Sequence, residues 1–269
     1  MKLVKWAGII YLDMVYFYSN KTKNRPKLLY YYILFLIKFF LFRNFKIKSE
    51  YIFNHKVHFP DYSLFFLLFR EIFFRGDYSI DLKEDSIIYD IGANIGITTL
   101  YYKFRFPKCK IICYEPDPVN FKYLLMNTSN FKNIACINCA VSDKNGKISF
   151  LSSKNGSVVS KINREKREMG EDVDCINFSD LLQKEIDLCK MDIEGEEFRV
   201  INELYKKNKI DLVKEWIIEY HHNPKKQSEI SFFINFFETT GFKVQLRAMN
   251  LNLNTKNKLQ GMLMHFYKG

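Results

Sequence analysis

The pattern of apolar and polar residues divides the chain into two parts of different character. The first part is strongly apolar: residues 1–60 favour helices that end near a loop at Asn54–Pro60, and Tyr62–Phe74 is a further helical stretch. Beyond it, short apolar runs alternate with longer amphipathic ones, which is typical of strand–helix units around a parallel sheet. The pattern therefore predicts a helical extension over residues 1–76 and an α/β domain over residues 77–269.

The α/β part contains enough strand-like runs for a seven-stranded sheet. The predicted strands are residues 86–89, 110–114, 134–138, 188–191, 216–219, 242–246 and 262–267, with a side strand at 147–151. The predicted helices are residues 97–106, 117–127, 196–207 and 228–240. Because no long helical pattern joins the last two strands, we expect them to form an antiparallel pair. The other strands, joined by helices, predict a doubly wound, Rossmann-like α/β fold.

A glycine-containing loop follows the first predicted strand, with the sequence Asp90-Ile-Gly92-Ala-Asn94-Ile-Gly96. Gly92 and Gly96 allow the backbone to turn sharply and to approach a ligand closely. The helix that follows presents free N–H groups to a negatively charged group. Glu115, 19 residues beyond Gly96, ends the second strand, where an acid can accept both ribose hydroxyls of an adenosine-containing cofactor. The two strand tips together predict a site for such a cofactor.

Two adenosine cofactors satisfy this spacing, and Asp90 distinguishes between them. A dinucleotide loop has the pattern G-x-G-x-x-G, which gives a pyrophosphate room, but here Asp90 occupies the place of the first glycine. An acid there repels a pyrophosphate and can pair with the ammonium group of a methionine moiety. This favours S-adenosylmethionine, and an NAD-dependent oxidoreductase is the alternative.

Four motifs of this sequence carry a resemblance to a known family. They are Asp90–Gly96, Glu115-Pro116-Asp117-Pro118, Ala140–Asp143 with Gly146, and Lys190-Met-Asp192-Ile-Glu194-Gly195-Glu-Glu197. In order and spacing they resemble the FkbM family of methyltransferases, over about residues 77 to 222. Residues 1–60 carry no such match.

The resemblance implies a binding role for each motif. The first motif would hold the methionine part of S-adenosylmethionine, Glu115 the ribose, and the segment after the third strand the adenine. Tyr78 resembles a family position that closes over the cofactor, and the loop of Ser157 resembles one that approaches the acceptor. The implied cofactor residues are Tyr78, Asp90, Gly92, Ala93, Asn94, Gly96, Thr98, Glu115, Pro116, Ala140, Val141, Ser142 and Asp192. The implied reaction is O-methylation of a hydroxyl on a sugar, a nucleotide-linked sugar or a glycolipid or polysaccharide precursor, with N-methylation as an alternative.

Acidic and histidine side chains follow the fourth and fifth predicted strands. Asp192 and Glu194 follow the fourth strand, and Glu219, His221 and His222 follow the fifth. Reacting groups collect at the carboxyl ends of strands in a doubly wound sheet, so we expect these residues to be neighbours. Methylation of a hydroxyl requires removal of its proton by a group within hydrogen-bond reach. Asp192 is the first choice for this acid–base role, and His221 is the alternative base.

The same side chains suit a second role. Asp192, Glu219 and His221 offer the ligand types that hold a divalent ion such as Mg²⁺ or Mn²⁺, which would polarise the acceptor hydroxyl. Glu194 and Glu197 also have a purely structural interpretation, because acids in the first turn of a helix complement its dipole.

The net charge of +11 is concentrated at one end of the chain. Residues 1–60 carry 11 Lys and Arg against two acids, Asp13 and Glu50, whereas the remaining residues carry 30 basic and 28 acidic side chains. The α/β part therefore lacks the basic surface of a nucleic-acid-binding protein, and we expect no nucleic-acid partner.

The N-terminal part is apolar but interrupted. Ten apolar residues, Leu28–Ile37, are followed by Lys38, whereas a bilayer span needs about 20 residues. Two interpretations of residues 1–48 remain open. They form an interfacial membrane helix flanked by basic residues, or they form helices packed on the domain or on a partner subunit of a homo-oligomer. The six cysteines, including the pair Cys136 and Cys139, suit buried free thiols. We expect a cytoplasmic location, at the inner face of the membrane if the helix is interfacial. A non-catalytic membrane-associated scaffold is the remaining alternative.

Overall fold

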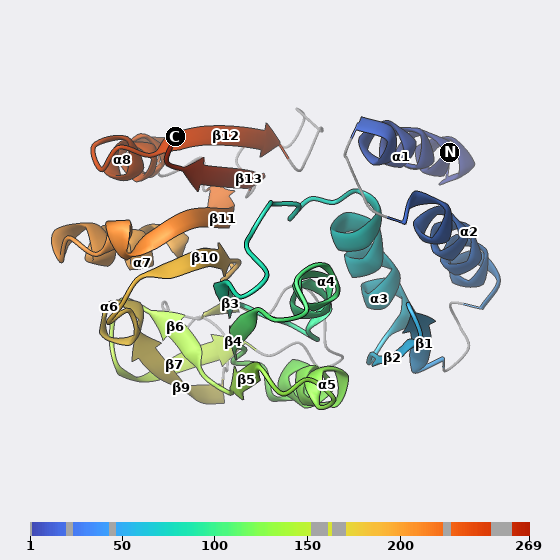
Figure 1. Ribbon diagram of the computed structural model, residues 1–269, viewed down its shortest axis with the longest axis horizontal. Coiled ribbons are helices and arrows are strands. Elements are labelled where there is room, and N and C mark those ends of the chain that lie inside the picture. Colours follow the sequence, from blue (N-terminus) through green and yellow to red (C-terminus); the bar gives the residue numbers. More distant parts are fainter. Residues whose placement is uncertain are drawn as a thin grey trace.

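The computed structural model describes residues 2–19, 24–42, 47–151, 161–162, 171–222, 227–248 and 260–269 (Figure 1). The N-terminal part consists of α1 (Lys2–Ser19), α2 (Arg25–Phe42), β1 (Ser49–Ile52), β2 (His55–His58), α3 (Tyr62–Leu68) and the π-helix η1 (Phe69–Phe74). Helices thus form most of the described part of residues 1–76, together with the two short strands. Ser157 lies outside the described residues.

The predicted seven-stranded sheet is confirmed. Its strands are β3 (Ile87–Ile91), β4 (Lys110–Tyr114), β5 (Ile134–Ile137), β10 (Ile186–Met191), β11 (Val213–His222), β12 (Lys243–Ala248) and β13 (Gln260–Tyr267). They lie in the order β12-β13-β11-β10-β3-β4-β5. β13 pairs antiparallel with both β11 and β12, and the other neighbours in the sheet are parallel. The last two strands thus form the antiparallel pair that the sequence predicts.

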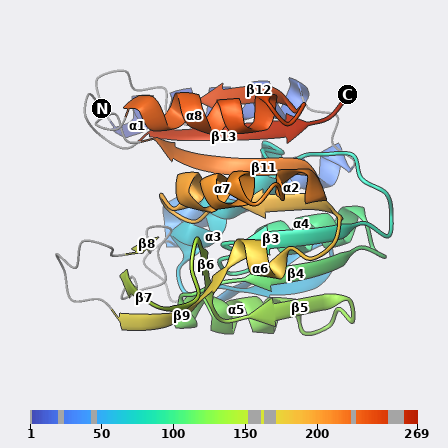
Figure 2. The ribbon, with the colours of Figure 1, turned by 90° about the vertical axis from the view of Figure 1, so that its left-hand side faces the viewer.

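Helices cover both faces of this sheet, as a doubly wound fold requires. They are α4 (Ile97–Arg105), α5 (Pro118–Thr128), α6 (Phe178–Leu181), α7 (Glu197–Lys206), the 3₁₀ helix η2 (Ile210–Leu212) and α8 (Gln227–Glu238). α6, α7 and α8 lie on one side of the sheet, and α4, α5 and the N-terminal helices lie on the other (Figures 1 and 2). α5 begins where Asp117 caps it by accepting hydrogen bonds from the backbone N–H groups of Val119 and Asn120.

Each face of the sheet has its own apolar core because alternate residues of a strand point to opposite sides. Ile88 belongs to a core that continues into α1 and α2, whereas its neighbour Tyr89 belongs to the core that is shared with α7 and α8. Phe74 is central to the first core: its ring stacks on Phe17 of α1 at a centroid distance of 4.3 Å and on Tyr32 of α2 at 3.9 Å. The extension is therefore packed on the domain.

A second, four-stranded sheet stands beside the first and was only partly predicted. It consists of β6 (Ala140–Ser142), β7 (Gly146–Leu151), β8 (Lys161–Ile162) and β9 (Glu171–Asn177), in the order β6-β9-β7-β8. The predicted side strand corresponds to β7. β6 and β8 are too short to give a periodic signal in the sequence. β6 matters for function because it carries Ala140 and Val141 to the candidate site.

Two local expectations were wrong. The hairpin β1–β2 replaces the end of the helical segment expected before Pro60, and its turn places Phe53 and Asn54 at φ of 48° and 67°. Such a turn favours Asn and Gly, so a phenylalanine there gives no turn signal. β11 extends through His221 and His222, which therefore lie on the strand rather than after it, because β13 pairs with it up to Gln260.

None of the described helices combines the length and the apolar character that are needed to cross a bilayer.

Candidate active site

A cavity opens at the carboxyl ends of the central strands and encloses about 970 Å³, its open mouth included. Most of the predicted cofactor residues line it, namely Tyr78, Gly92, Ala93, Asn94, Thr98, Glu115, Pro116, Ala140, Val141 and Asp192. The predicted catalytic residues Glu194 and Glu219 line it as well, and η1 contributes Glu71 and Ile72 to its wall. The tips of β3, β4, β10 and β11 therefore meet at one cavity.

The loop after β3 packs closely against the backbone of Asp192, which follows β10, because Gly92 has no side chain. Gly92 has a φ of 76°, and a Cβ atom there would lie 1.8 Å from the carbonyl oxygen of Asp192. The backbone N–H groups of Gly92 and Ala93 both donate to the carbonyl oxygen of Tyr114, at 2.9 and 3.0 Å. These bonds fix the loop against the tip of β4, and Gly92 is required by both conformation and space.

Glu115 lies at the tip of β4 with its carboxylate in the cavity wall. Its two oxygens accept hydrogen bonds from the backbone N–H groups of Asn94, at 2.8 Å, and Asp117, at 2.9 Å. Burial raises the pKa of Glu115 to about 8, although the two backbone donors oppose the shift. A carboxylate has about four lone-pair positions, so two remain for hydroxyl donors. This arrangement fits the ribose of an adenosine cofactor.

Three predicted cofactor residues, Asp90, Gly96 and Ser142, are buried and do not line the cavity, so their expected roles stay predictions. Asp90 accepts a hydrogen bond from Thr99 Oγ1 at 2.7 Å and lies 3.3 Å from Lys190 Nζ, so its charge is already paired with a protein cation. Gly96 packs on Leu124, whose Cδ1 would lie 2.8 Å from a Cβ atom at this glycine. Ser142 Oγ donates to Asp143 at 2.9 Å.

Lys190, the first residue of the fourth motif, is a further site residue for which the sequence predicted no role. Its ammonium group donates to the carbonyl oxygen of Gly92 at 2.7 Å and forms the ion pair with Asp90, and its side chain lines the cavity. Burial alone would lower the pKa of Lys190, but the nearby carboxylates of Asp90, Asp192 and Glu219 raise it instead. A lysine inside the buried strand run 188–191 was the signal available in the sequence. Lys190 thus lies between the glycine loop and the carboxylates of Asp192 and Glu219.

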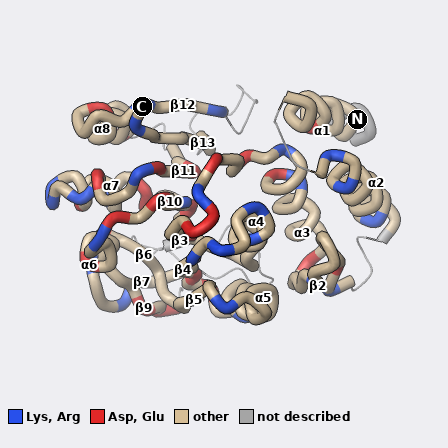
Figure 3. Tube along the Cα trace, viewed as in Figure 1, with Lys and Arg blue, Asp and Glu red and all other residues tan. Residues whose placement is uncertain are grey.

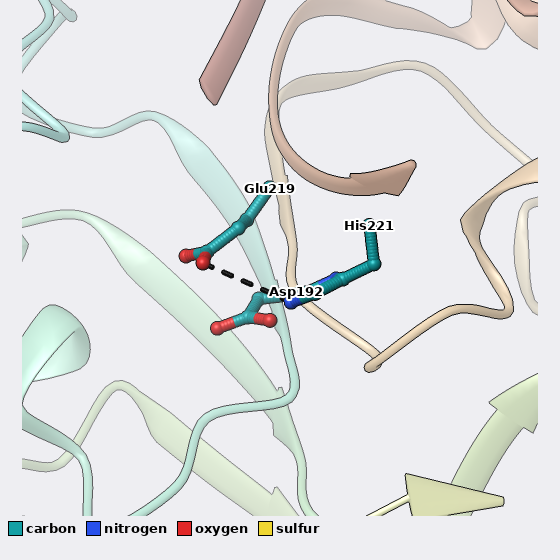
Figure 4. Close-up of side chains that lie close together, drawn as sticks. All are labelled: Asp192, Glu219 and His221. Atoms are coloured by element: carbon teal, nitrogen blue, oxygen red, sulfur yellow. Dashed lines mark ion pairs between the residues drawn. The ribbon is translucent and has the colours of Figure 1, made fainter. Parts of the chain in front are cut away.

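The acidic end of the cavity brings together the predicted catalytic residues (Figure 4). One ligand atom each of Asp192, Glu219 and His221 lies within 4.8 Å of the others. His221 Nε2 is 3.4 Å from Glu194 Oε2 and 3.8 Å from Glu219 Oε1. Tyr78 closes this end by donating a hydrogen bond to Glu219 Oε2 at 3.1 Å. The residues at the ends of the fourth and fifth predicted strands are therefore neighbours, as the sequence predicts.

Glu197 has a more specific role than the helix-dipole interpretation gives it. Its Oε1 accepts from the backbone N–H of Gly195 at 3.0 Å and lies 3.0 Å from His221 Nδ1. Burial opposes the charge on His221, but Glu197 and the neighbouring acids prevail and raise its pKa to about 11. An imidazole that already carries both protons cannot accept another. The raised pKa thus disfavours His221 as the alternative base, and this role stays a prediction.

The fold and the cavity define a class of protein. A seven-stranded sheet with one antiparallel strand, and a cavity bounded by a glycine loop and an acid on neighbouring strand tips, are the arrangement of a Rossmann-like methyltransferase with an S-adenosylmethionine-binding fold. Residues 90–244 match the FkbM methyltransferase domain, and the chain belongs to this family. The match assigns a methyltransferase domain to these residues, which argues against the NAD-dependent alternative.

Individual relatives match only part of their length. Methyltransferase sdnD of Sordaria araneosa is 26% identical over 50% of this chain and 66% of its own. The 2-O-methyltransferase NoeI of Sinorhizobium fredii is 28% identical over 44% of this chain and 57% of its own. The chain thus spans less than two thirds of these relatives. The crystal structure of an FkbM methyltransferase from Methylobacillus flagellatus is 15% identical with a TM-score of 0.49, covering 73% of this chain and 47% of that one.

Proposed function

We propose that this protein is an S-adenosylmethionine-dependent O-methyltransferase that acts on a hydroxyl group of a sugar, a nucleotide-linked sugar or a glycolipid or polysaccharide precursor. The observation that carries the proposal is a single cavity with Glu115 at one end and the carboxylates of Asp192 and Glu219 at the other. The first end suits a ribose and the second suits a hydroxyl acceptor, so one cavity offers places for both reactants.

The residues of the cavity divide the work between binding and proton transfer. Glu115 holds the ribose hydroxyls, and Ala140 and Val141 contact the adenine. S-adenosylmethionine, when bound, supplies a methyl group whose bond to sulfur breaks as its bond to the acceptor oxygen forms. Asp192 takes the proton that this oxygen loses. Burial raises the pKa of Asp192, which makes its carboxylate a stronger base.

The acceptor is inferred from the chemistry of the acidic end and from the relatives. Carboxylates outnumber the single lysine, Lys190, among the lining residues of the cavity, which suits an uncharged hydroxyl donor better than a phosphate. NoeI is by name a 2-O-methyltransferase, which supports oxygen rather than nitrogen as the methylated atom. N-methylation is the alternative, and product analysis by mass spectrometry distinguishes the two linkages.

Calorimetric titration with S-adenosylmethionine tests the cofactor site. We expect saturable binding by the full-length protein and loss of binding in Glu115→Ala, because the ribose loses its acceptor. Glu215→Ala is a matched control, since this acid on β11 pairs with His265 at 2.8 Å away from the cavity, and it should bind normally. Binding retained in Glu115→Ala, or tight binding of NAD instead, would contradict the proposed site.

The acidic end also supports a divalent cation, Mg²⁺ or Mn²⁺, as a second candidate feature. A histidine that ligates a metal commonly donates its other ring N–H to a carboxylate, and Glu197 lies 3.0 Å from His221 Nδ1 in this way. Asp192 Oδ1 has no hydrogen-bond partner among the described residues. A cation would displace the Nε2 proton of His221 and polarise the acceptor hydroxyl.

Turnover of Asp192→Asn, measured with and without chelator, separates the two roles of this residue. We expect turnover to fall by about 100-fold or more, the scale of a lost general base, with cofactor affinity within a few fold of wild type. Asp211→Asn, at a surface ion pair with Lys268, should keep full turnover. If EDTA abolishes wild-type activity and Mg²⁺ or Mn²⁺ restores it, the cation is required; activity unchanged by EDTA removes the cation and leaves Asp192 as the base.

A further inference from the structure

The outward faces of α1 and α2 are apolar. On α1 the exposed side chains are Ala7, Tyr11, Leu12, Val15, Tyr18 and Ser19, and on α2 they are Pro26, Lys27, Tyr30, Ile33, Ile37, Phe40 and Leu41. These positions recur at helical spacing, so they form one stripe on each helix. Tyr11, Tyr18 and Leu41 are each more than 60% exposed, at 69%, 63% and 64%. Large apolar side chains in a contiguous group mark an interaction surface.

Both stripes point away from the rest of the protein. The opposite faces of the two helices are buried, and Phe17 of α1 and Tyr32 of α2 stack on the same residue of η1, Phe74. Trp6 of α1 packs against Phe40 of α2 at a centroid distance of 5.1 Å. Tyr32 Oη donates to Asp13 Oδ2 at 2.7 Å and Arg25 Nη2 donates to the carbonyl oxygen of Tyr18 at 3.4 Å, so the two helices are in contact near both ends and in the middle (Figure 1). The two stripes therefore form one surface, which we call the outer apolar face.

The charges around the outer apolar face are basic. Asp13 is the one acid within α1 and α2, and it is buried in an ion pair with Arg70 at 2.8 Å. Arg25 and Lys27 lie at the start of α2, along which Figure 3 shows basic but no acidic positions. An apolar surface with aromatic residues and a basic border matches an anionic bilayer in both apolar character and charge.

We propose that the outer apolar face of α1 and α2 binds the surface of an anionic lipid bilayer, with both helices lying along the interface. A second copy of the chain fits less well, because two basic borders would repel each other whereas anionic headgroups neutralise them. Tyrosine and tryptophan rings favour the depth at which headgroups meet acyl chains. The helices cannot sink further, because their other faces are held in the protein core by Phe74.

The surface has a direct structural relation to the cavity. η1 packs against α1 and α2 through Phe74, and it also contributes Glu71 and Ile72 to the cavity wall. One short helix thus joins the membrane-facing layer to the acidic end of the candidate active site. Docking on a bilayer would place that end near acceptors carried by lipids. This last step rests on the proposed function, whereas membrane binding itself does not.

Co-sedimentation with vesicles tests the proposal on the full-length protein. We expect binding to vesicles of phosphatidylglycerol and phosphatidylcholine, weaker binding to phosphatidylcholine alone, and weakening by salt. The double variant Ile33→Glu, Ile37→Glu places two acids on the exposed stripe of α2, where these residues are 46% and 49% exposed. Its partition into anionic vesicles should fall about tenfold or more, because apolar contact is lost and negative charge is added.

A matched variant and two further measurements make the result decisive. Phe232→Glu, Leu246→Glu changes two apolar residues that are both 54% exposed but lie on α8 and β12, and it should bind vesicles as wild type does. Both double variants should keep the wild-type melting temperature and S-adenosylmethionine affinity. The proposal is overturned if wild type does not sediment with anionic vesicles or if the α2 variant binds equally well. A wild-type dimer that the α2 variant makes monomeric, without vesicle binding, would assign the surface to a second copy of the chain.

Discussion

Glu115 shows how one buried carboxyl group can make cofactor binding depend on pH. Its folded-state pKa of about 8 lies above the ordinary value of 4.5 because burial disfavours the charge. At neutral pH the free protein therefore holds a proton on Glu115. A carboxylate that accepts two ribose hydroxyls must be ionised, so binding must release this proton at any pH below about 8.

This predicts that nucleoside affinity rises with pH and then levels off near pH 8. Adenosine is the suitable probe, because it lacks the amino and carboxyl groups of S-adenosylmethionine that titrate themselves. Below the pKa, the dissociation constant should fall by about tenfold for each pH unit. Calorimetry in two buffers of different ionisation enthalpy measures the proton release directly. In Glu115→Gln the residual affinity should be independent of pH, and an equal slope in that variant would show that another group titrates.

The sequence predicts the Glu115 end of the cavity better than the acidic end with Asp192, Glu219 and His221. Glu115 could be placed because its role depends on a strand tip and a fixed distance from a glycine loop. The pair of Glu197 and His221 could not, because it depends on β11 continuing to residue 222 and on Glu194 adopting a φ of 55°. Lys190 was missed because a strand pattern shows that a residue is buried but not which acid lies beside it.

Among the elements, the short helix η1 contacts both the N-terminal helices and the cavity. Phe74 at its end is fully buried between the rings of Phe17 and Tyr32. A phenylalanine in such a place contributes through the area it buries and through ring stacking. The packing of α1 and α2 on the domain thus depends on Phe74 of η1, the element that also contributes to the cavity wall.

We expect Phe74→Ala to lower the free energy of unfolding by about 3–5 kcal/mol, the usual range for a large aromatic side chain removed from a core. Denaturant titration followed by circular dichroism measures the change. Phe232→Ala, on the exposed side of α8, is the control and should change stability by less than about 0.5 kcal/mol. A small effect at Phe74 would mean that α1 and α2 contribute little to the stability of the domain.

Most of the strands that the sequence could not predict share a physical cause. The strands β1, β2, β6 and β8 have between two and four residues each, which is too short for an alternating pattern to stand out from neighbouring apolar residues. They are stabilised by partners far away in sequence. For instance, the backbone N–H of His58 in β2 donates to Asn127 Oδ1 of α5 at 2.7 Å, and the carbonyl oxygen of His58 accepts from Asn127 Nδ2 at 2.9 Å. The strands of the main sheet carry their own apolar pattern and were predicted, although β11 (Val213–His222) extends beyond the expected residues 216–219 at both ends.

At the scale of the whole molecule, one core joins the two parts that the sequence separates at residue 76. The same cluster of buried residues contains Phe17 and Tyr32 of the extension and Ile88 and Leu188 of the sheet. The charge of the chain is distributed differently: it is basic at residues 1–60 and nearly balanced beyond them. The extension thus differs from the domain in surface character while sharing its interior.

A shared interior predicts cooperative unfolding. We expect the amides of α1 and α2 to lose protection from hydrogen exchange at the same denaturant concentration as those of β3 and β10, because opening either part exposes the common core. Native-state exchange read out by mass spectrometry on peptides from residues 2–42 and 87–91 measures this. In Phe74→Ala the extension should lose protection first, since the ring that joins it to η1 is gone. If the amides of the wild-type extension exchange well before those of the sheet, residues 1–76 are a separate folding unit. The boundary at residue 76 would then divide two parts that unfold independently.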